Sequence, residues 1–374
     1  MNAKQELTDL TMCRAAFAAW VVIYHVDLYL NFSRYLGPAA DLIRHGYLGV
    51  DGFFFLSGLI LARVHPEIAG AAMRESNPKF SPPPLRVMLH FWGKRLVRIY
   101  PVHLAAILIL AILIIAGALQ GWTPRDPSRF SIGALLQNLA LVQGWGGASQ
   151  GTWNYPSWSV STEWAGYLLF PILWYLAGWS IVYVAIQVMI AAFTVLGLIF
   201  VLHGFNLNLA FAAGLFRFFP EFIIGICSTR LVSYCADSAG FRKFGLVAGG
   251  VAAVGGAAWG IDLLAVFGLW LVLFAFLMQA DAERPPVLGR NPVLNWLGKL
   301  SYSFYMSFSI AELLLCQAFR RYGWPPATHA VIFATGMLAI TFGLAVFLHI
   351  VVENPSRRIA DGWLTRPAPA INPA

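Results

Sequence analysis

The sequence predicts an all-α, polytopic bundle of about ten transmembrane helices with both termini in the cytoplasm. Three observations predict this fold. The chain of 374 residues is 59% hydrophobic and only 11% charged, whereas soluble domains carry about 25% charged residues. It also contains a series of apolar stretches close to the roughly 20 residues that a helix needs to cross a bilayer. Finally, Lys and Arg gather in alternate connecting segments, the pattern that sets membrane orientation.

The first half of the chain contains three predicted spans and two long connections. The span 11–30 starts where a signal peptide would, but it is long, carries His25 and Asp27 and lacks a small-residue cleavage site, so we expect it to be retained. The spans 46–64 and 99–119 flank a basic cytoplasmic segment, 65–98. Its run Ser81-Pro82-Pro83-Pro84 excludes one continuous helix. An outer segment rich in Gly, Trp and Pro follows over 120–157.

The second half supplies the remaining predicted spans, joined mostly by short connections: 158–177, 179–201, 212–232, 244–260, 263–280, 297–318 and 329–352. Within 212–232, Arg217 and Glu221 lie four residues apart, a spacing that favours an ion pair between them. Little chain remains for a soluble domain. We therefore expect a single transmembrane domain over 1–358 and a disordered, Pro/Ala-rich cytoplasmic tail over 359–374.

Composition also narrows the class of partner. The net charge of +8 is spread over loops between spans, so membrane orientation explains it and nucleic-acid binding is not expected. The four cysteines are scattered, which favours neither a disulfide framework nor a metal site. The residues leave the oligomeric state open between a monomer and a homodimer.

Arg14 and His25 are the most informative pair in the chain. They lie eleven residues apart on the first span, which is close to three helical turns, so both face the same way at roughly 16 Å separation along the axis. Ionisable groups inside a bilayer are costly and usually face a cavity or a partner. The pair predicts a site that holds an anion at the membrane surface and carries out chemistry deeper in the bundle.

Six short stretches, in order along the chain, resemble the acyltransferase-3 family of integral membrane O-acyltransferases. They are the pair Arg14 and His25, the run Gly49-Val50-Asp51-Gly52-Phe53-Phe54-Phe55-Leu56-Ser57-Gly58, the basic motif Arg95-Leu96-Val97-Arg98-Ile99-Tyr100-Pro101, the run Trp158-Ser159-Val160-Ser161-Thr162-Glu163, the run Leu297-Gly298-Lys299-Leu300-Ser301-Tyr302-Ser303-Phe304-Tyr305, and the run Val352-Glu353-Asn354-Pro355. The chain departs from the family at Phe308, where relatives often have a His. We also expect no soluble extension of the kind that some relatives carry.

The resemblance implies transfer of an acyl group, most often acetyl, from cytoplasmic acyl-coenzyme A to a hydroxyl of an envelope or exported glycan, with the protein in the bacterial inner membrane. No His, Asp or Glu cluster in the sequence has metal-ligand spacing, so we expect no metal cofactor. Acetyl-CoA is the expected donor substrate. A lipid-linked sugar is one form that the acceptor could take.

Candidate site residues follow from this expectation and from their own chemistry. His25 is the candidate general base, since a neutral imidazole is available near pH 7. Asp51 either caps its helix or orients His25, and Glu163 either pairs with an arginine or orients the acceptor. Glu353 is expected to pair with an Arg of the basic segment. The candidates for donor binding are Arg14, Arg95, Arg98 and Tyr100, and those for the acceptor or acyl group are Trp153, Trp158, Tyr302 and Tyr305.

Several alternatives stay open from the sequence. The basic residues could serve only as membrane anchors, and the aromatic residues could serve only in packing. The transfer could run through a covalent acyl-histidine. The acyl group could be succinyl or longer, and the acceptor could be a small molecule or a lipid. In a different functional class, a transporter of a sugar-type substrate would also use buried charges and unwound Gly/Pro segments.

Overall fold

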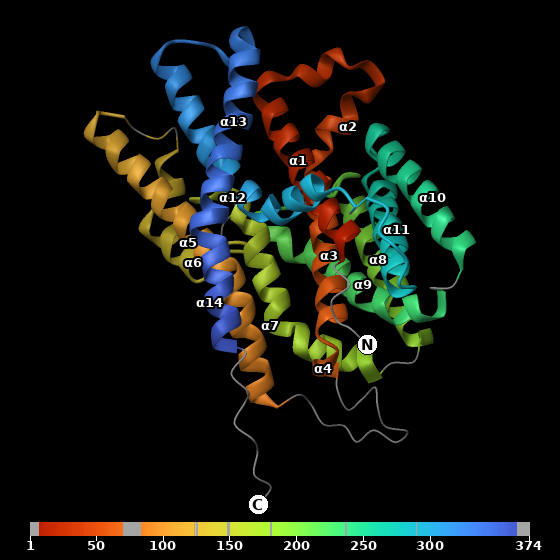
Figure 1. Ribbon diagram of the computed structural model, residues 1–374. Coiled ribbons are helices and arrows are strands. Elements are labelled where there is room, and N and C mark those ends of the chain that lie inside the picture. The colour runs from red at the N-terminus through yellow and green to blue at the C-terminus, as the bar shows by residue number, and fades with distance from the viewer. Residues whose placement is uncertain are drawn as a thin grey trace, which may run out of the picture.

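The structure is a computed structural model that describes residues 7–364 apart from 70–83, 123, 125, 148–149, 180–181, 236–237 and 289. All regular secondary structure in the described residues is helical (Figure 1). Its long helices are α1 (Thr8–Leu30), α3 (Gly49–Val64), α5 (Leu85–Leu119), α7 (Trp158–Trp179), α8 (Val182–Leu202), α9 (Gly214–Cys235), α10 (Ala239–Ala258), α11 (Asp262–Asp281), α12 (Pro292–Arg321) and α13 (Ala330–Leu348). Each predicted span falls on one of them, which confirms the polytopic helical bundle.

Seven helical segments of the described chain are long and apolar enough to cross a membrane: Thr8–Leu30, Gly46–Val64, Leu85–Leu119, Val182–Leu202, Phe211–Cys235, Asp262–Asp281 and Pro326–Ile359. The other three predicted spans form α7, α10 and α12. Sequence explains the lower hydropathy of two of them, because α10 is rich in Gly and Ala and the first half of α12 carries the polar side chains Asn295, Lys299, Ser301 and Ser303.

Helix ends follow local sequence signals. Helix α1 stops where Asn31 adopts a left-handed conformation with φ of 48°, which asparagine tolerates better than most residues. Helix α12 starts at Pro292, and the Asn291 side chain accepts hydrogen bonds from the backbone N–H groups of Val293 and Leu294, as expected of an N-terminal cap.

Two predicted boundaries are wrong. Helix α5 begins at Leu85 rather than at residue 99 and runs through Pro101, so the Arg95–Arg98 motif is helical and not part of a loop. Proline is tolerated inside membrane helices because neighbouring groups satisfy the freed carbonyl. The Ser81–Pro83 part of the basic segment lies outside the described residues, and a short helix, α4 (Pro66–Ala69), precedes that gap.

The last helix also continues beyond its predicted end. A π-helical turn over His349–Glu353 follows α13, and α14 (Asn354–Leu364) follows that turn. The wider π turn shifts the hydrogen-bond register immediately before Pro355, which cannot donate a backbone bond. Residues 359–364 of the expected tail are therefore helical, and the remainder of the tail lies outside the described residues.

Helices α1, α3 and α9 contribute side chains to each of the two apolar cores and join them. Helix α1 packs along α12, and α3 packs along α9. Glycine permits the second contact: a Cβ at Gly58 would lie 3.0 Å from the backbone nitrogen of Ile226, and a Cβ at Gly225 would lie 2.9 Å from that of Leu59. Small residues commonly allow such close approach between membrane helices.

The two poles of the bundle carry different connections (Figure 1). Helix α4, the start of α5 and the end of α14 lie at the lower pole of the view, whereas α2 (Ala40–Arg44) and the link between α12 and α13 lie at the upper pole. This distribution matches the predicted alternation of connections between the two sides of a membrane. A short helix of the 120–157 segment, α6 (Ile132–Leu139), packs near α5.

Candidate active site

Three adjoining cavities run along the contact between α1 and α12. The inner cavity, of about 40 Å³, is lined by Arg14, Phe53, Phe54, Ser57, Ser159, Val160, Glu163, Ser301, Tyr302 and Tyr305. The middle cavity, of about 200 Å³, is lined by Val21, Tyr24, His25, Tyr47, Val50, Tyr155, Pro156, Trp158, Asn208, Ala210, Phe211, Arg217, Tyr305 and Phe308. The outer cavity, of about 550 Å³, is lined by Tyr29, Pro124, Asp126, Arg129, Phe130, Gln150, Gly151, Tyr155, Phe211, Glu312, Leu313 and Cys316.

Shared side chains connect these cavities in series. Tyr305 lines both the inner and the middle cavity. Tyr155 and Phe211 line both the middle and the outer cavity. Arg14 and His25 therefore belong to adjoining chambers on one line, as their helical spacing predicts.

Opposite charges face each other in the inner cavity. The Arg14 Nε donates to the Ser301 hydroxyl at 3.2 Å, and its guanidinium lies 5.7 Å from the Phe53 ring centre. Across the cavity, the Glu163 carboxylate accepts hydrogen bonds from Ser57 and Tyr167. A cation and a carboxylate on facing walls give this chamber a strong internal field.

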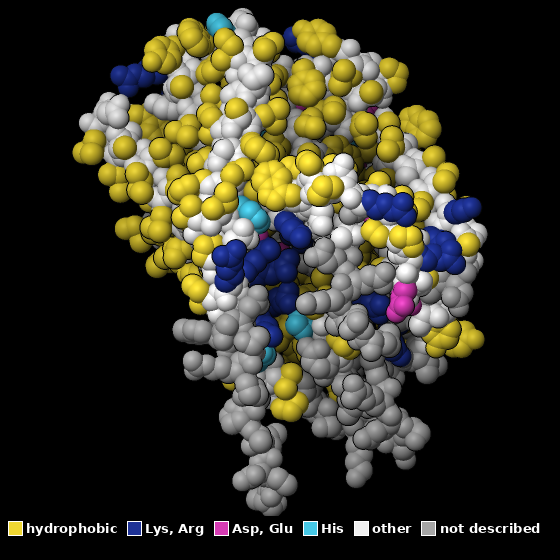
Figure 2. All heavy atoms as spheres, in the orientation of Figure 1, with side chains coloured by type: hydrophobic (Ala, Val, Ile, Leu, Met, Phe, Trp, Pro, Cys, Tyr) yellow, Lys and Arg dark blue, Asp and Glu magenta, His cyan; other side chains and the backbone are white. Residues whose placement is uncertain are grey.

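Two further cations lie near Arg14. Both Arg98 on α5 and Arg357 on α14 act on it electrostatically. Glu163 offsets part of the charge on Arg14, and Glu353 binds Arg357. The N–H donors of three neighbouring arginines nevertheless suit an anion such as phosphate. On one face of the molecule, Figure 2 shows Lys and Arg side chains gathered in a hollow beneath a broad apolar surface.

Arg95 lies one turn before Arg98 on α5, as the spacing predicts. It is buried, its Nη2 contacts His65 Nε2 at 2.6 Å, and its guanidinium lies 5.5 Å from the Phe91 ring centre and 6.0 Å from the Tyr167 ring centre. These contacts hold Arg95 between His65, its own helix and α7, whose Tyr167 also donates to Glu163.

Two predicted binding residues lie away from the cavities and fasten the 120–157 segment. The Tyr100 hydroxyl donates to the Leu139 carbonyl at 3.1 Å. The buried Trp153 indole donates to the Ser131 carbonyl at 3.2 Å. Both side chains use their polar atoms within the fold, so their positions favour packing over ligand contact.

His25 occupies the middle cavity in a defined orientation. Its Nδ1 lies 2.8 Å from the Val21 carbonyl oxygen. Because a carbonyl oxygen only accepts hydrogen bonds, this contact requires the ring proton on Nδ1 and leaves the Nε2 lone pair available. The ring packs 4.5 Å from Phe308 and 5.7 Å from Tyr155, centre to centre. Trp158 lines the same cavity.

The two predicted tyrosines of α12 differ in position. Tyr302 lines the inner cavity and donates to the Ile99 carbonyl at 2.6 Å. Tyr305 donates to the Pro156 carbonyl at 3.1 Å and accepts from the Ser159 hydroxyl at 3.0 Å. Tyr305 thus joins α12 to the start of α7 at the boundary between two chambers.

Asp51 has a partner that the sequence did not reveal. The predicted pair between Arg217 and Glu221 is wrong: the Arg217 Nε donates to Asp51 Oδ1 at 2.7 Å, and its Nη2 contacts the other carboxylate oxygen. Asp51 therefore braces α3 against α9, and the Val21 carbonyl rather than Asp51 orients His25. Glu221 lies fully buried beside this pair.

Glu353 also has a different partner from the predicted one. Its carboxylate accepts hydrogen bonds from Ser303 at 2.6 Å, from His349 Nδ1 at 2.8 Å and from Arg357. Arg357 belongs to α14 and not to the basic 65–98 segment. Glu353 therefore joins the π turn to α12 and positions Arg357 near Arg14.

Sequence reasoning missed the group at the boundary of the outer cavity. The Glu312 carboxylate accepts hydrogen bonds from Tyr29 at 2.6 Å and from Tyr155. Tyr29 stands one turn after His25 on α1, and Glu312 stands one turn after Phe308 on α12. Extending the His25 face by one helical turn would have found Tyr29.

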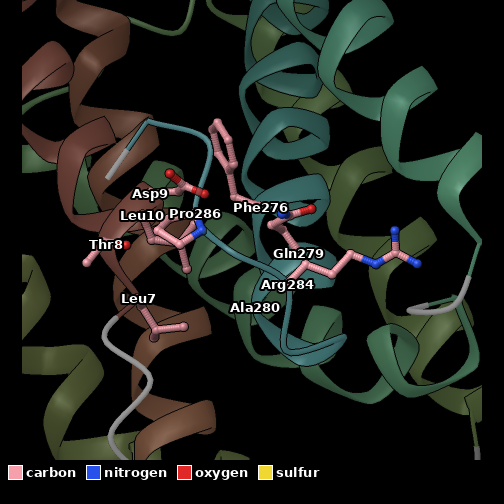
Figure 3. Close-up of a pocket in the computed structure, with 9 residues that line it drawn as sticks. All are labelled: Leu7, Thr8, Asp9, Leu10, Phe276, Gln279, Ala280, Arg284 and Pro286. Carbon is pink, nitrogen blue, oxygen red and sulfur yellow. The ribbon is translucent and has the colours of Figure 1, made fainter. Parts of the chain in front are cut away.

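A small fourth pocket lies apart from this line, at the start of α1 (Figure 3). There the Asp9 carboxylate accepts hydrogen bonds from the backbone N–H groups of Val287 and Leu288, at 2.9 and 2.7 Å. The contact fastens the segment between α11 and α12. Among the residues that the structure describes, no group of three or more His, Cys, Asp or Glu side chains is placed to hold a metal ion.

Comparisons with known proteins match nearly the whole chain. The model of the acyltransferase-3 family, described as an acyltransferase domain, matches residues 7–349. The acyltransferase MdmB of Streptomyces mycarofaciens is 28% identical over 411 residues, which cover 98% of this chain and 97% of that protein. The search of solved structures returns no match.

Proposed function

The chain belongs to the acyltransferase-3 family of membrane acyltransferases, and on this premise we propose that it transfers an acyl group, acetyl first, from cytoplasmic acyl-coenzyme A to a hydroxyl of an envelope or exported glycan. One observation carries the proposal. A cationic chamber at Arg14 adjoins a chamber that holds a suitably oriented imidazole at His25. The arrangement pairs anion binding with base catalysis on a single line through the bundle.

The donor would bind at the inner end. Its phosphates would meet Arg14 and Arg98, with Arg357 as a third cation that the sequence analysis did not assign. Guanidinium groups suit this role because they offer paired N–H donors that match phosphate oxygens. Arg95 would support the wall of this site from behind, through its contacts with Phe91 and Tyr167.

The chemistry would take place at His25. Its Nε2 would accept the proton of the acceptor hydroxyl as the oxygen attacks the thioester carbonyl. The new C–O bond forms, the C–S bond breaks, and the imidazolium returns the proton to the departing thiolate. Base catalysis from a positioned side chain contributes about 10²–10⁴-fold. The Val21 carbonyl would hold the required tautomer throughout.

The acceptor would enter through the outer cavity. Aromatic side chains such as Trp158, Phe211 and Tyr155 line the route to His25 and suit stacking against a sugar ring. The acyl group would thereby cross the membrane while the glycan stays outside. We propose the bacterial inner membrane as the location and one transmembrane domain over 1–358 as the catalytic unit, active as a monomer or a homodimer.

Replacing His25 by Ala tests the base assignment. We expect loss of label transfer from radiolabelled acetyl-CoA to the envelope fraction, with folding and donor binding retained. His203→Ala is the matched control, because the His203 side chain bonds to Asn206 at an exposed site. Turnover retained in His25→Ala would contradict the role of His25.

Replacing Arg98 by Ala tests the donor site. We expect a higher KM for acetyl-CoA with kcat less affected, because phosphate contacts act in the ground state and in the transition state alike. Arg44→Ala is the control, since Arg44 is an exposed cation paired with Asp41 at the opposite pole. An unchanged KM in Arg98→Ala would favour plain membrane anchoring for this residue.

A small-molecule acceptor is the second candidate, and the outer cavity favours it. Its volume of about 550 Å³ falls within the range of small-ligand pockets, about 300–1,000 Å³. Label recovered in a soluble, low-mass product rather than in the envelope fraction would select this candidate. A transporter remains the rival from another class, and uptake into vesicles without any acyl donor would select it.

A further inference from the structure

Tyr305 is the one residue that lines both the inner and the middle cavity among those that the structure describes. The residue is only 6% exposed. Its hydroxyl is held from both sides: it donates to the carbonyl of Pro156, which lines the middle cavity, and it accepts from Ser159, which lines the inner cavity. The phenol is thus fixed across the boundary between the two chambers.

Aromatic neighbours complete this barrier. The Tyr305 ring centre lies 6.0 Å from that of Phe53 in the inner cavity and 5.7 Å from that of Phe308 in the middle cavity. Phe308 in turn packs on His25. The layer between Arg14 and His25 is therefore built from aromatic rings, and the hydrogen bonds of the Tyr305 hydroxyl lie at its centre.

We propose that Tyr305 is a gate that separates the donor chamber from the acceptor chamber and keeps water away from the thioester until an acceptor is bound. The naming of the chambers rests on the proposed function, whereas the separation itself rests on the geometry alone. A thioester is exposed to attack by any water that reaches its carbonyl. An open passage would therefore let water from the larger cavities compete with the acceptor. Gating of this kind is a common task of mobile side chains and loops at active sites.

Opening the gate requires two changes at Tyr305. The hydroxyl must leave two hydrogen bonds, and the ring must rotate away from Phe53 and Phe308. Tyr305→Phe removes both hydrogen bonds and keeps the ring, whereas Tyr305→Ala removes the ring as well. The two variants should therefore open the passage to different degrees, with Tyr305→Ala the more open.

The first test measures passage directly and needs no acyl donor. Ser57→Cys places a thiol in the inner cavity with little change in size, while native Cys316 lines the outer cavity as an internal reference. Intact cells are treated with a small, membrane-impermeant methanethiosulfonate, and labelling of each thiol is read by peptide mass spectrometry. We expect the introduced thiol at position 57 to be protected when Tyr305 is present. It should be labelled at least about tenfold faster in Tyr305→Phe and Tyr305→Ala, the scale set by loss of two hydrogen bonds.

The second test measures the consequence for chemistry. Water attacks acetyl-CoA to give acetate and the free coenzyme A thiol, which a thiol reagent detects in the absence of any acceptor. We expect slow release from the wild type and faster release from both Tyr305 variants, with acetyl-CoA binding retained by calorimetry. Tyr322→Phe, an exposed tyrosine at the end of the same helix, should match the wild type.

The outcomes separate the gate from the proposed function. Labelling of the introduced thiol at position 57 as fast as that of Cys316, with Tyr305 in place, would overturn the gate, whatever the activity. Unchanged thiol release from variants that still bind acetyl-CoA would overturn it as well. Failure of every protein to bind acetyl-CoA, with the position-57 thiol protected only when Tyr305 is present, would support the gate and reject the donor proposed above.

Discussion

Replacing Arg217 by Met should destabilise the protein more than replacing its partner Asp51 by Asn. The two side chains are 1% and 0% exposed. Arg217 also donates to the Tyr47 carbonyl at 3.0 Å, so its guanidinium joins α3, α9 and the segment before α3. The two replacements should differ in their cost to stability because of Glu221, which is fully buried beside the pair.

The expected magnitudes follow from what each replacement leaves behind. Arg217→Met leaves the buried Asp51 without its cation, and breaking a buried pair in this way costs about 3–5 kcal/mol. Asp51→Asn leaves Arg217 next to Glu221, whose carboxylate can replace the lost partner. Its cost should then be close to that of hydrogen bonds to a charged group, about 1.5–3 kcal/mol. The double replacement should cost less than the sum of the two single ones.

Thermal unfolding of the four proteins in one detergent measures these differences. The exposed pair Arg44 and Asp41, at 48% and 43% exposure, supplies the control, since Arg44→Ala should change stability by about 0–1 kcal/mol. Additive effects of the two single replacements, or a cost for Asp51→Asn that equals or exceeds that of Arg217→Met, would refute the reasoning.

Two further predictions concern packing. Gly225→Ala should cost about 1–3 kcal/mol in thermal unfolding, because its Cβ would press on the backbone of α3. A Cβ at Gly250 meets open space, so Gly250→Ala should be neutral or stabilising by up to about 1 kcal/mol. Equal effects at both sites would contradict the close contact. Phe308→Ala should lower the free energy of unfolding by about 3–5 kcal/mol and lower turnover, because it removes a fully buried ring that packs on His25. A loss of stability well below that range would contradict the prediction and mean that the surroundings close around the site.

The sequence was sufficient to predict the helical bundle, because bilayer-length apolar segments carry a strong signal that needs no tertiary information. Helix ends were harder to place. Local rules treat a proline as a break, yet α5 passes through Pro101, and the chain passes Pro355 by way of a π turn. At Pro355 the π turn changes the hydrogen-bond register. Inside a membrane helix, neighbouring groups can satisfy the carbonyl that a proline frees. Sequence rules include neither effect.

In the site too, features of a single helix could be predicted and contacts between helices could not. Arg14 and His25 were found because both lie on one helix, where spacing fixes direction. The partner of Arg217 was missed because Asp51 lies 166 residues away in the chain, while Glu221 stands at the familiar distance of four. Contacts between distant helices depend on how the helices pack, and no spacing rule encodes that.

Calorimetric titration of the purified, detergent-solubilised protein with acetyl-CoA tests the central claim most directly, with free coenzyme A and succinyl-CoA measured alongside. We predict saturable binding of a thioester that is retained in His25→Ala and weakened at least about tenfold in Arg14→Ala, the scale of one or two lost charge-assisted hydrogen bonds. The preferred thioester would identify the acyl group. Failure of the folded protein to bind any thioester, or equal binding by Arg14→Ala, would contradict the account.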